Sequence, residues 1–333
     1  MSDHWDSPGL SRGEEVKTRR LFSVARAAEI LRAGGLVAFP TETVYGLGAD
    51  GLDGAAVRAV FAAKGRPADN PLILHVAGMD QAAGVARLES RARDLAGRFW
   101  PGPLTLVLPA LDRVPPEVRA GLPSVAVRCP RHPVALALIA ACGRPLAAPS
   151  ANRSGRPSPT TAAAVLEELD GRIDAVLDGG PCALGVESTV VDATGGDLRL
   201  LRLGALPAER LGLAPQVASD APTRSPGMRH RHYAPAVPVF VVADLAEGLV
   251  AHPDAAVLCT VDDARRLGLR RGPAVEVLPA DPVRRAAALY GALRRLERSG
   301  RPCILAGALA PKGTDAAVMD RLRRAAADGP PGG

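Results

Sequence analysis

The stretch LVAFPTETVYGLG, residues 36–48, joins a short apolar segment to a loop rich in hydroxyl groups. Apolar residues at helical spacing over 24–31 predict a helix that ends at Gly34. The segment 36–39 then predicts a strand, which Pro40 ends. A helix, a strand and a polar loop thus follow one another here, and the same alternation recurs along the chain.

Further helices and strands alternate up to about residue 211. Such alternation predicts an α/β or α+β domain over residues 21–211, preceded by a flexible tail at 1–20. The predicted helices are 55–63, 91–99, 133–141 and 160–169, and the predicted strands are 72–76, 104–108, 125–128, 175–177, 189–191 and 199–202.

A second rhythm begins at residue 237, after a segment rich in Pro, Ser, Ala and Arg that predicts a linker over 212–236. Strands at 237–242, 255–260, 274–278 and 303–307 each precede a helical pattern, two of them at 282–296 and 316–327. Four βα units predict a small Rossmann-like domain over residues 237–333.

Composition excludes several classes of protein. The longest apolar stretch, Val134 to Cys142, is too short for a membrane span, and the polar N-terminus MSDHWDSPGL does not resemble a secretory signal. Five scattered cysteines without a CxxC pair are typical of reduced thiols, so we expect a cytoplasmic protein without membrane contact. A net charge of +6 and 3% aromatic residues are weak indications of nucleic-acid binding.

Several loops carry groups suited to ligands, and each has a plainer interpretation. The loop TETVYGLG could bind a small polar substrate or be a turn with capping threonines. Lys64 and Arg66 in KGRPADNPLILH, residues 64–75, suit phosphate oxygens but also suit a solvated helix end. His75 is either a ligand contact or a hydrogen-bonded core residue. Gly46, Gly48 and Gly51 match GxGxxG, but they lie too far beyond the strand for a dinucleotide fingerprint.

Three further segments combine cations with hydroxyls. Arg128 closes the strand of SVAVRCP, residues 124–130, where a charge is costly unless it meets an anion. The loop AAPSANRSGRPSPT, residues 147–160, precedes a helix and is either a phosphate cradle or a Ser/Pro-rich turn. Ser188 begins one strand and Arg202 ends the next.

The sequence lacks the better-known catalytic motifs. It contains no Walker A loop, kinase motif set, GxSxG elbow or zinc-ligand spacing. His230 and His232 form an HxH pair, but no third metal ligand lies near them in the sequence, so we predict no metal site.

Seven segments in order resemble the Sua5 branch of the Sua5/YrdC/YciO family, over about residues 23–235. The resemblance implies a twisted mixed-sheet YrdC-type domain with a central positive cavity, a Rossmann-like Sua5 domain, and a linker that lies across the active site. The seven segments are PTETVYGLG, KGRPADNPLILH, FWPGPLTLVL, VAVRCP, AAPSANRSGRPSPT, GVESTVVD and SPGMRHRHYAP.

The family's functional residues carry over to matching positions. The resemblance implies that a tetrad is catalytic, that a second group binds L-threonine and that a third binds ATP. These groups are Lys64, Arg66, Ser150 and Asn152 for catalysis; Thr43, His75, Arg128, Ala148 and Ser188 for threonine; and Arg66, Asn70, Ser124, Ser150, Ser158, Arg202 and Tyr233 for ATP.

The resemblance further implies synthesis of threonylcarbamoyl-adenylate from ATP, L-threonine and bicarbonate, with Mg²⁺ carried on the nucleotide and Tyr233 as part of a lid. The product would pass to the tRNA threonylcarbamoyl-transferase complex, with a possible weak contact to tRNA. Two alternatives stay open: a carbamoyl-adenylate-forming carbamoyltransferase, and an RNA-binding module. One position departs from the pattern, because MDRLRRAA has Asp320 where we expect Asn.

Overall fold

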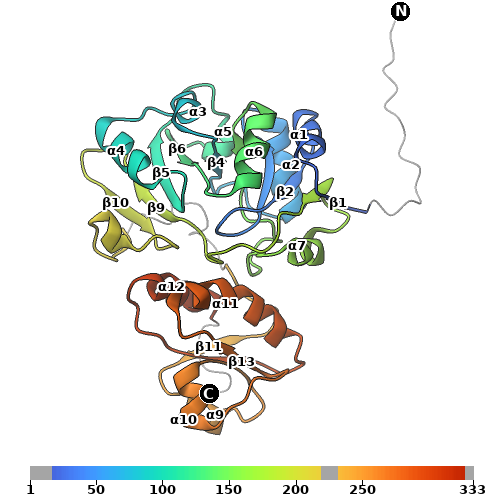
Figure 1. Cartoon of the computed structure of the whole chain (residues 1–333), viewed down its shortest axis with the longest axis vertical. Coiled ribbons are helices and arrows are strands. Elements are labelled where there is room, and N and C mark those ends of the chain that lie inside the picture. Colours follow the sequence, from blue (N-terminus) through green and yellow to red (C-terminus); the bar gives the residue numbers. More distant parts are fainter. Residues whose placement is uncertain (1–16, 219–231, 327–333) are drawn as a thin grey trace, which may run out of the picture.

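The computed structural model describes residues 17–218 and 232–326, which form two lobes, each built on its own β-sheet (Figure 1). The larger lobe has a mixed sheet with strand order β1-β8-β2-β3-β7-β4-β6-β5-β9-β10. Its strands are β1 (Arg19–Leu21), β2 (Val37–Phe39), β3 (Gly46–Asp50), β4 (Ile73–His75), β5 (Leu104–Pro109), β6 (Ser124–Arg128), β7 (Leu146–Ala147), β8 (Ala175–Leu177), β9 (Thr189–Asp192) and β10 (Arg199–Arg202).

Helices connect these strands, and local sequence explains where several of them begin and end. Ser23 caps α1 and Asp53 caps α2, because each side chain accepts a hydrogen bond from a backbone N–H of the first turn. Gly65 ends α2 with φ of 60°, a left-handed conformation that favours glycine. The helices are α1 (Val24–Arg32), α2 (Gly54–Lys64), α3 (Met79–Ala83), α4 (Ser90–Phe99), α5 (Pro116–Arg119), α6 (Pro133–Cys142), α7 (Ala162–Leu169) and the 3₁₀ helix η1 (Ala208–Leu211).

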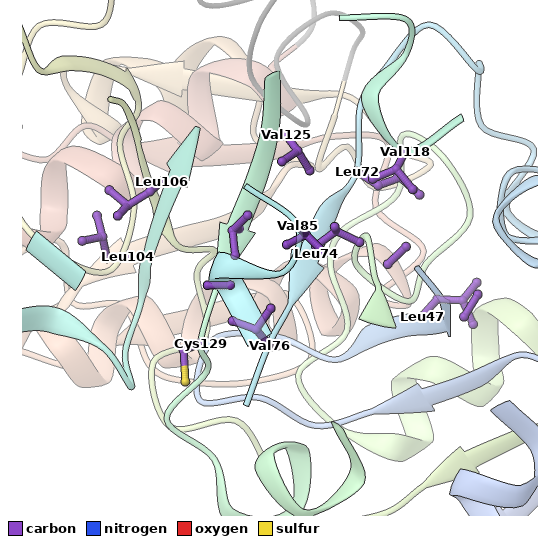
Figure 2. Close-up of a cluster of buried hydrophobic side chains, with 14 of the residues drawn as sticks. Leu47, Leu72, Leu74, Val76, Val85, Leu104, Leu106, Val118, Val125 and Cys129 are labelled. Atoms are coloured by element: carbon purple, nitrogen blue, oxygen red, sulfur yellow. The ribbon is translucent and has the colours of Figure 1, made fainter. Parts of the chain in front are cut away.

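Strands β4 and β6 direct apolar side chains to one face of the sheet, where the core of the large lobe lies, and polar side chains to the other face. Leu74 and Val127 belong to the large apolar cluster whose members from neighbouring strands are shown in Figure 2. Side chains alternate along a strand, so His75 and Arg128 lie on the other face. Both polar side chains are buried, which means that this face is covered.

Two predictions about the large lobe need correction. The last residues of the tail predicted for 1–20 belong to the folded lobe instead, because Arg19–Leu21 pairs in parallel with β8 and Thr18 is buried. The segment predicted as a loop around TETVYGLG contains β3, which pairs antiparallel with β2. Glycine lowers strand propensity, and two glycines in five residues concealed this strand.

The smaller lobe is a parallel sheet with strand order β11-β14-β12-β13, as expected for a Rossmann-like domain. Helices α11 and α12 lie on the side of this sheet that faces the large lobe (Figure 1). The elements are β11 (Val239–Val242), α9 (Leu245–Ala251), β12 (Ala256–Thr260), α10 (Val261–Leu267), β13 (Val275–Leu278), α11 (Pro282–Glu297), β14 (Ile304–Gly307) and α12 (Thr314–Ala325).

Arginine–glutamate pairs join α11 to the large lobe. Arg294 donates to Glu168 over 2.8 Å, and both side chains are buried. Arg156 of the large lobe holds both carboxylate oxygens of Glu297, each at 2.8 Å. Bidentate arginine–carboxylate pairs fix orientation as well as distance, so they fix the position of α11 relative to the large lobe at this interface.

Two further findings concern the described residues. None of their helices combines the length and the apolar character that crossing a bilayer requires. All five cysteines are buried and free of disulfide bonds.

Gly204 lies where two backbone segments approach closely. A Cβ atom at this position would be 2.3 Å from the carbonyl carbon of Ser188 and 2.3 Å from the amide nitrogen of Thr189. We expect Gly204→Ala to lower the free energy of unfolding by about 2–3 kcal/mol, because the clash is with backbone. Gly195→Ala is the matched control, since nothing lies within 4 Å of its added Cβ. Urea denaturation of both variants tests this, and equal midpoints would contradict it.

Candidate functional site

A cavity opens on the covered face of the large sheet, beside β4 and β6. The space left between the protein atoms is about 660 Å³, a figure that includes space open to solvent. Ten of the residues named above as candidates line it: Thr43, Arg66, His75, Arg128, Ala148, Ser150, Asn152, Ser188, Arg202 and Tyr233.

Sheet register brings the first two of these residues together. His75 and Arg128 are Cα partners on the neighbouring parallel strands β4 and β6, so both side chains lie on the same face. Ala148 follows β7, on the other side of β4, and its backbone N–H donates to the carbonyl of Ile73 over 3.0 Å. The three residues therefore form one rigid corner of the cavity.

Arg128 is held from three directions. Its Nη1 donates to Thr43 Oγ1 over 2.9 Å, and its Nε to the carbonyl of Gly102 over 3.3 Å. Its Nη2 lies 2.7 Å from Glu42 Oε2, in an ion pair whose side chains are 4% and 7% exposed. A buried charge without such a partner would be strongly destabilising, so Glu42 makes the burial of Arg128 possible.

Ser188 and Arg202 form a second corner. The Oγ of Ser188 lies 2.7 Å from Thr105 Oγ1 on β5 and accepts from Arg202 Nη2 over 3.0 Å. Arg202 also donates to the Ser188 carbonyl through Nε at 3.1 Å and Nη2 at 2.9 Å. The pairing of β9 with β10 thus presents a cation and a hydroxyl to the same space.

Arg66, Ser150 and Asn152 line the side of the cavity next to the end of α2. An isolated bridge between Gly46 and Ser150 ties the loop after β7 to β3. Asn152 Nδ2 donates to the carbonyls of Arg153 and Arg156, which fixes its amide. Arg66 Nη2 donates to two carbonyls at 3.3 Å, while its buried Nε has no hydrogen-bond partner among the described residues.

Four predicted residues do not line this cavity. The Nζ of Lys64 donates to the carbonyl of Ser150 over 2.5 Å and to that of Asn152, so Lys64 supports the loop from behind and faces a neighbouring pocket. Ser158 Oγ donates to Glu187 over 2.5 Å. The other two, Asn70 and Ser124, are buried outside the cavity lining.

Residues from the end of the predicted linker complete the wall. His232 and Tyr233 both line the cavity and are largely buried. Residues 219–231 of the linker, including His230 of the HxH pair, lie outside the described residues. Within the described ranges, no group of three or more His, Cys, Asp and Glu side chains could hold a metal ion.

Burial and positive neighbours set the charges in the cavity. Burial, reinforced by Arg128, lowers the pKa of His75 to about 3. Burial, with Arg66 and Lys64 nearby, lowers the pKa of His232 to about 3 as well. Burial lowers the pKa of Arg66 to about 10, which leaves it cationic at neutral pH. Both imidazoles are therefore neutral, and guanidinium groups supply the positive charge of the cavity.

The candidates drawn from the sequence left out both carboxylates that balance this charge. Glu42 pairs with Arg128, and Glu187 lines the cavity beside Ser188. Burial raises the pKa of Glu187, but Arg321 and Arg202 outweigh burial and leave that pKa below its ordinary value. Each carboxylate is adjacent in sequence to a predicted hydroxyl residue, which was the available signal.

Comparisons with known proteins match both lobes. A family model described as "Telomere recombination", for Sua5, YciO and YrdC proteins, matches residues 29–204. A second, described as "Threonylcarbamoyl-AMP synthase, C-terminal domain", matches residues 198–327. The chain belongs to the Sua5/YrdC/YciO family. Because both models match in order, it belongs to the Sua5 branch, as the sequence motifs predicted.

Individual relatives of this Sua5 family member align along most of the chain. A threonylcarbamoyl-AMP synthase of Pyrococcus abyssi is 45% identical over 314 residues, which cover 90% of this chain and 92% of that protein. The Bacillus subtilis protein of the same name is 42% identical, with 91% and 92% covered. The crystal structure of P. abyssi Sua5 complexed with L-threonine matches with a TM-score of 0.81 at 42% identity, covering 93% of this chain and 96% of that one.

The low pKa of His75 makes stability depend on pH. Between its folded pKa of about 3 and its ordinary value of 6.5, the unfolded chain binds a proton that the folded chain does not. This contribution to stability is complete above about pH 6.5 and is lost as pH falls. We expect His75 to lower the free energy of unfolding by up to about 1.4 kcal/mol per pH unit between about pH 6 and 5, and His232, whose pKa is also about 3, to add a contribution of the same sign.

Urea denaturation across this pH range measures the slope. His75→Gln removes one of these two titrating groups, so its slope should be shallower than that of the unmodified protein, with the contribution of His232 retained. Identical slopes for the two proteins would contradict the assignment of a neutral, buried His75.

Proposed function

We propose that the chain is an L-threonylcarbamoyladenylate synthase, which forms threonylcarbamoyl-AMP and pyrophosphate from ATP, L-threonine and bicarbonate. The observation that carries this proposal is the convergence of Arg66, Arg128, Arg202 and Ser188 on one cavity. Anions as different as a carboxylate and a triphosphate need guanidinium groups at separate corners, and the cavity offers them. The names of the Sua5 relatives support the same reaction.

Threonine fits the corner built by β4 and β6. Arg128 binds the threonine carboxylate, and its pairs with Thr43 and Glu42 fix the guanidinium before substrate arrives. Neutral His75, Ser188 and the backbone of Ala148 hold the rest of the amino acid. The structure of the P. abyssi relative in complex with L-threonine supports threonine as a ligand of this family member.

The chemistry needs alignment and charge stabilisation more than a strong base. Bicarbonate gives carbon dioxide and hydroxide, and the threonine amine attacks the carbon dioxide. The proton that the amine loses combines with the hydroxide, which leaves a carbamate and water. A carbamate oxygen then bonds to the α-phosphorus of ATP as the bond to the β-phosphate oxygen breaks, and pyrophosphate leaves. Arg66 and Arg202, which both line the cavity, stabilise the charge that builds on the phosphates.

The polar loop after β7 completes the nucleotide side of the site. Ser150 and Asn152 face the phosphates, and Lys64 holds that loop through its carbonyls. Mg²⁺ enters as the magnesium complex of ATP and is part of the substrate. The resemblance assigns Asn70, Ser124 and Ser158 to ATP. The Asn70 carbonyl accepts from Arg66 and Ser158 donates to Glu187, so these two support the cavity lining from behind.

The product is a reactive mixed anhydride, which water hydrolyses readily. Tyr233 and His232 close one side of the cavity, and they act as part of a lid over the intermediate. The adenylate then passes to the tRNA threonylcarbamoyl-transferase complex in the cytoplasm, with at most a weak direct contact between this chain and tRNA.

Loss of the Arg66 side chain tests the proposal. Arg66→Ala should lower turnover by roughly a hundredfold or more, because it removes a cation from the developing charge on the phosphates. The assay is threonine- and bicarbonate-dependent release of pyrophosphate from labelled ATP, together with detection of the adenylate. Arg26→Ala, which removes an exposed arginine paired with Glu29, is the control and should keep normal turnover. Near-normal pyrophosphate release by Arg66→Ala would count against the assignment.

A further inference from the structure

Tyr233 lines the cavity in a backbone conformation that tyrosine rarely adopts. Its φ is 68°, in the left-handed region, and its side chain is buried. A bulky residue keeps such a conformation only where its surroundings hold it there. The contacts around Tyr233 therefore show what sets this wall of the cavity.

Those contacts come largely from the smaller lobe. The ring of Tyr233 stacks on Tyr290 of α11, with centroids 5.7 Å apart and an interplanar angle of 28°. The guanidinium of Arg321 on α12 lies 5.0 Å from the centroid of the same ring. On the large lobe, the N–H of Ala234 donates to the carbonyl of Gly155 over 2.9 Å. The aromatic ring is thus held by two helices of the C-terminal lobe.

The same two residues of the C-terminal lobe bind Glu187, which also lines the cavity. Arg321 Nε donates to Glu187 Oε2 over 2.7 Å, and the hydroxyl of Tyr290 lies 3.0 Å and 3.1 Å from the two carboxylate oxygens. Ser158 of the large lobe supplies a third donor to Glu187. Glu187 therefore connects the lining of the cavity to the C-terminal lobe.

Arg321 is buried, with 1% of its surface exposed, and its charge is fully compensated. Beyond Glu187 it contacts Asp320 over 2.5 Å and donates through Nη2 to the carbonyl of Leu203 over 2.9 Å. Asp320 is the residue found where Asn was expected. Its carboxylate supplies a second negative charge to Arg321 and also pairs with Arg324 at 3.0 Å.

We propose that Arg321 is a positioning residue for the adenylate-forming site: it holds Glu187 and Tyr233 together, so that the C-terminal lobe shapes the nucleotide side of the cavity. Of the proposed threonine contacts, only Ser188 adjoins Glu187, whereas the corner that binds the threonine carboxylate depends on β4, β6 and β7 of the large lobe. Loss of Arg321 should therefore disturb ATP more than threonine. The kinetic part of this inference rests on the proposed function, whereas the structural part does not.

The first test is Arg321→Gln. We expect its KM for ATP to rise roughly tenfold, the scale of one lost cation–aromatic contact, with the KM for threonine changed less than about twofold. Amide hydrogen exchange over residues 232–236 should become faster, with or without ATP. Arg321→Lys, which keeps the charge, should recover part of both effects.

Arg324→Gln is the matched control. Arg324 lies on the same helix and also binds Asp320, but its side-chain hydrogen bonds within the described residues go to Asp320 and not to Glu187 or Tyr233. It should keep the exchange rate and the KM values of the unmodified protein. An effect equal to that of Arg321→Gln would mean that a general loosening of α12 is responsible, and would overturn the proposal.

Tyr290→Phe keeps the proposal testable if Arg321→Gln does not fold. This variant removes only the hydroxyl that donates to Glu187 and retains the stacked ring. It should raise the KM for ATP and the exchange over 232–236 in the same direction, by a smaller factor. Unchanged exchange in Tyr290→Phe and in any folded Arg321 variant overturns the positioning role. If the unmodified protein makes no adenylate, the proposed function fails, while the exchange data still decide the role of Arg321.

Discussion

The burial of arginine charge is the constraint on which this structure depends. Guanidinium groups of Arg128, Arg202 and Arg321 are almost completely removed from solvent, and desolvating each of them costs several kcal/mol unless an anion or carbonyl group compensates. Glu42 and Glu187 provide the anions, and backbone carbonyls provide further acceptors. A cavity for anionic substrates can exist in the folded protein because these partners are already in place.

This constraint also explains why the site is assembled from distant parts of the chain. Several cations on one strand or loop would lie close together and repel one another strongly, so a single segment cannot place them at separate corners. The mixed sheet solves this by register: β4 and β6 place His75 beside Arg128, whereas β9 and β10 place Ser188 beside Arg202. The threonine corner and the nucleotide side are therefore fixed by different strand pairs of a single sheet.

Buried arginine charges are also compensated at the interface between the two lobes. Arg294 and Glu168 form one buried pair between the lobes, and Arg321 and Glu187 form another. Removing one partner of a buried pair leaves the other charge buried without a counter-charge. These contacts therefore couple the relative position of the lobes to the charge arrangement of the cavity. Burial, reinforced by the same positive groups, lowers the pKa values of both neutral histidines. Stability and site geometry are thus consequences of one charge arrangement.

The sequence by itself determined the alternation of elements, the two-lobe organisation and half of the residues that line the cavity, because apolar periodicity and ordered motifs are local signals. The two glycines of β3 prevented its prediction as a strand. The sequence also assigned Lys64 to the cavity, whereas in the fold Lys64 holds the Ser150–Asn152 loop. Only the tertiary structure identified Glu42 and Glu187 as counter-charges and brought Arg321 to Tyr233. Such pairings depend on strand register and on the packing of the two lobes, which bring together residues far apart in sequence. Neither produces a periodic pattern in the sequence.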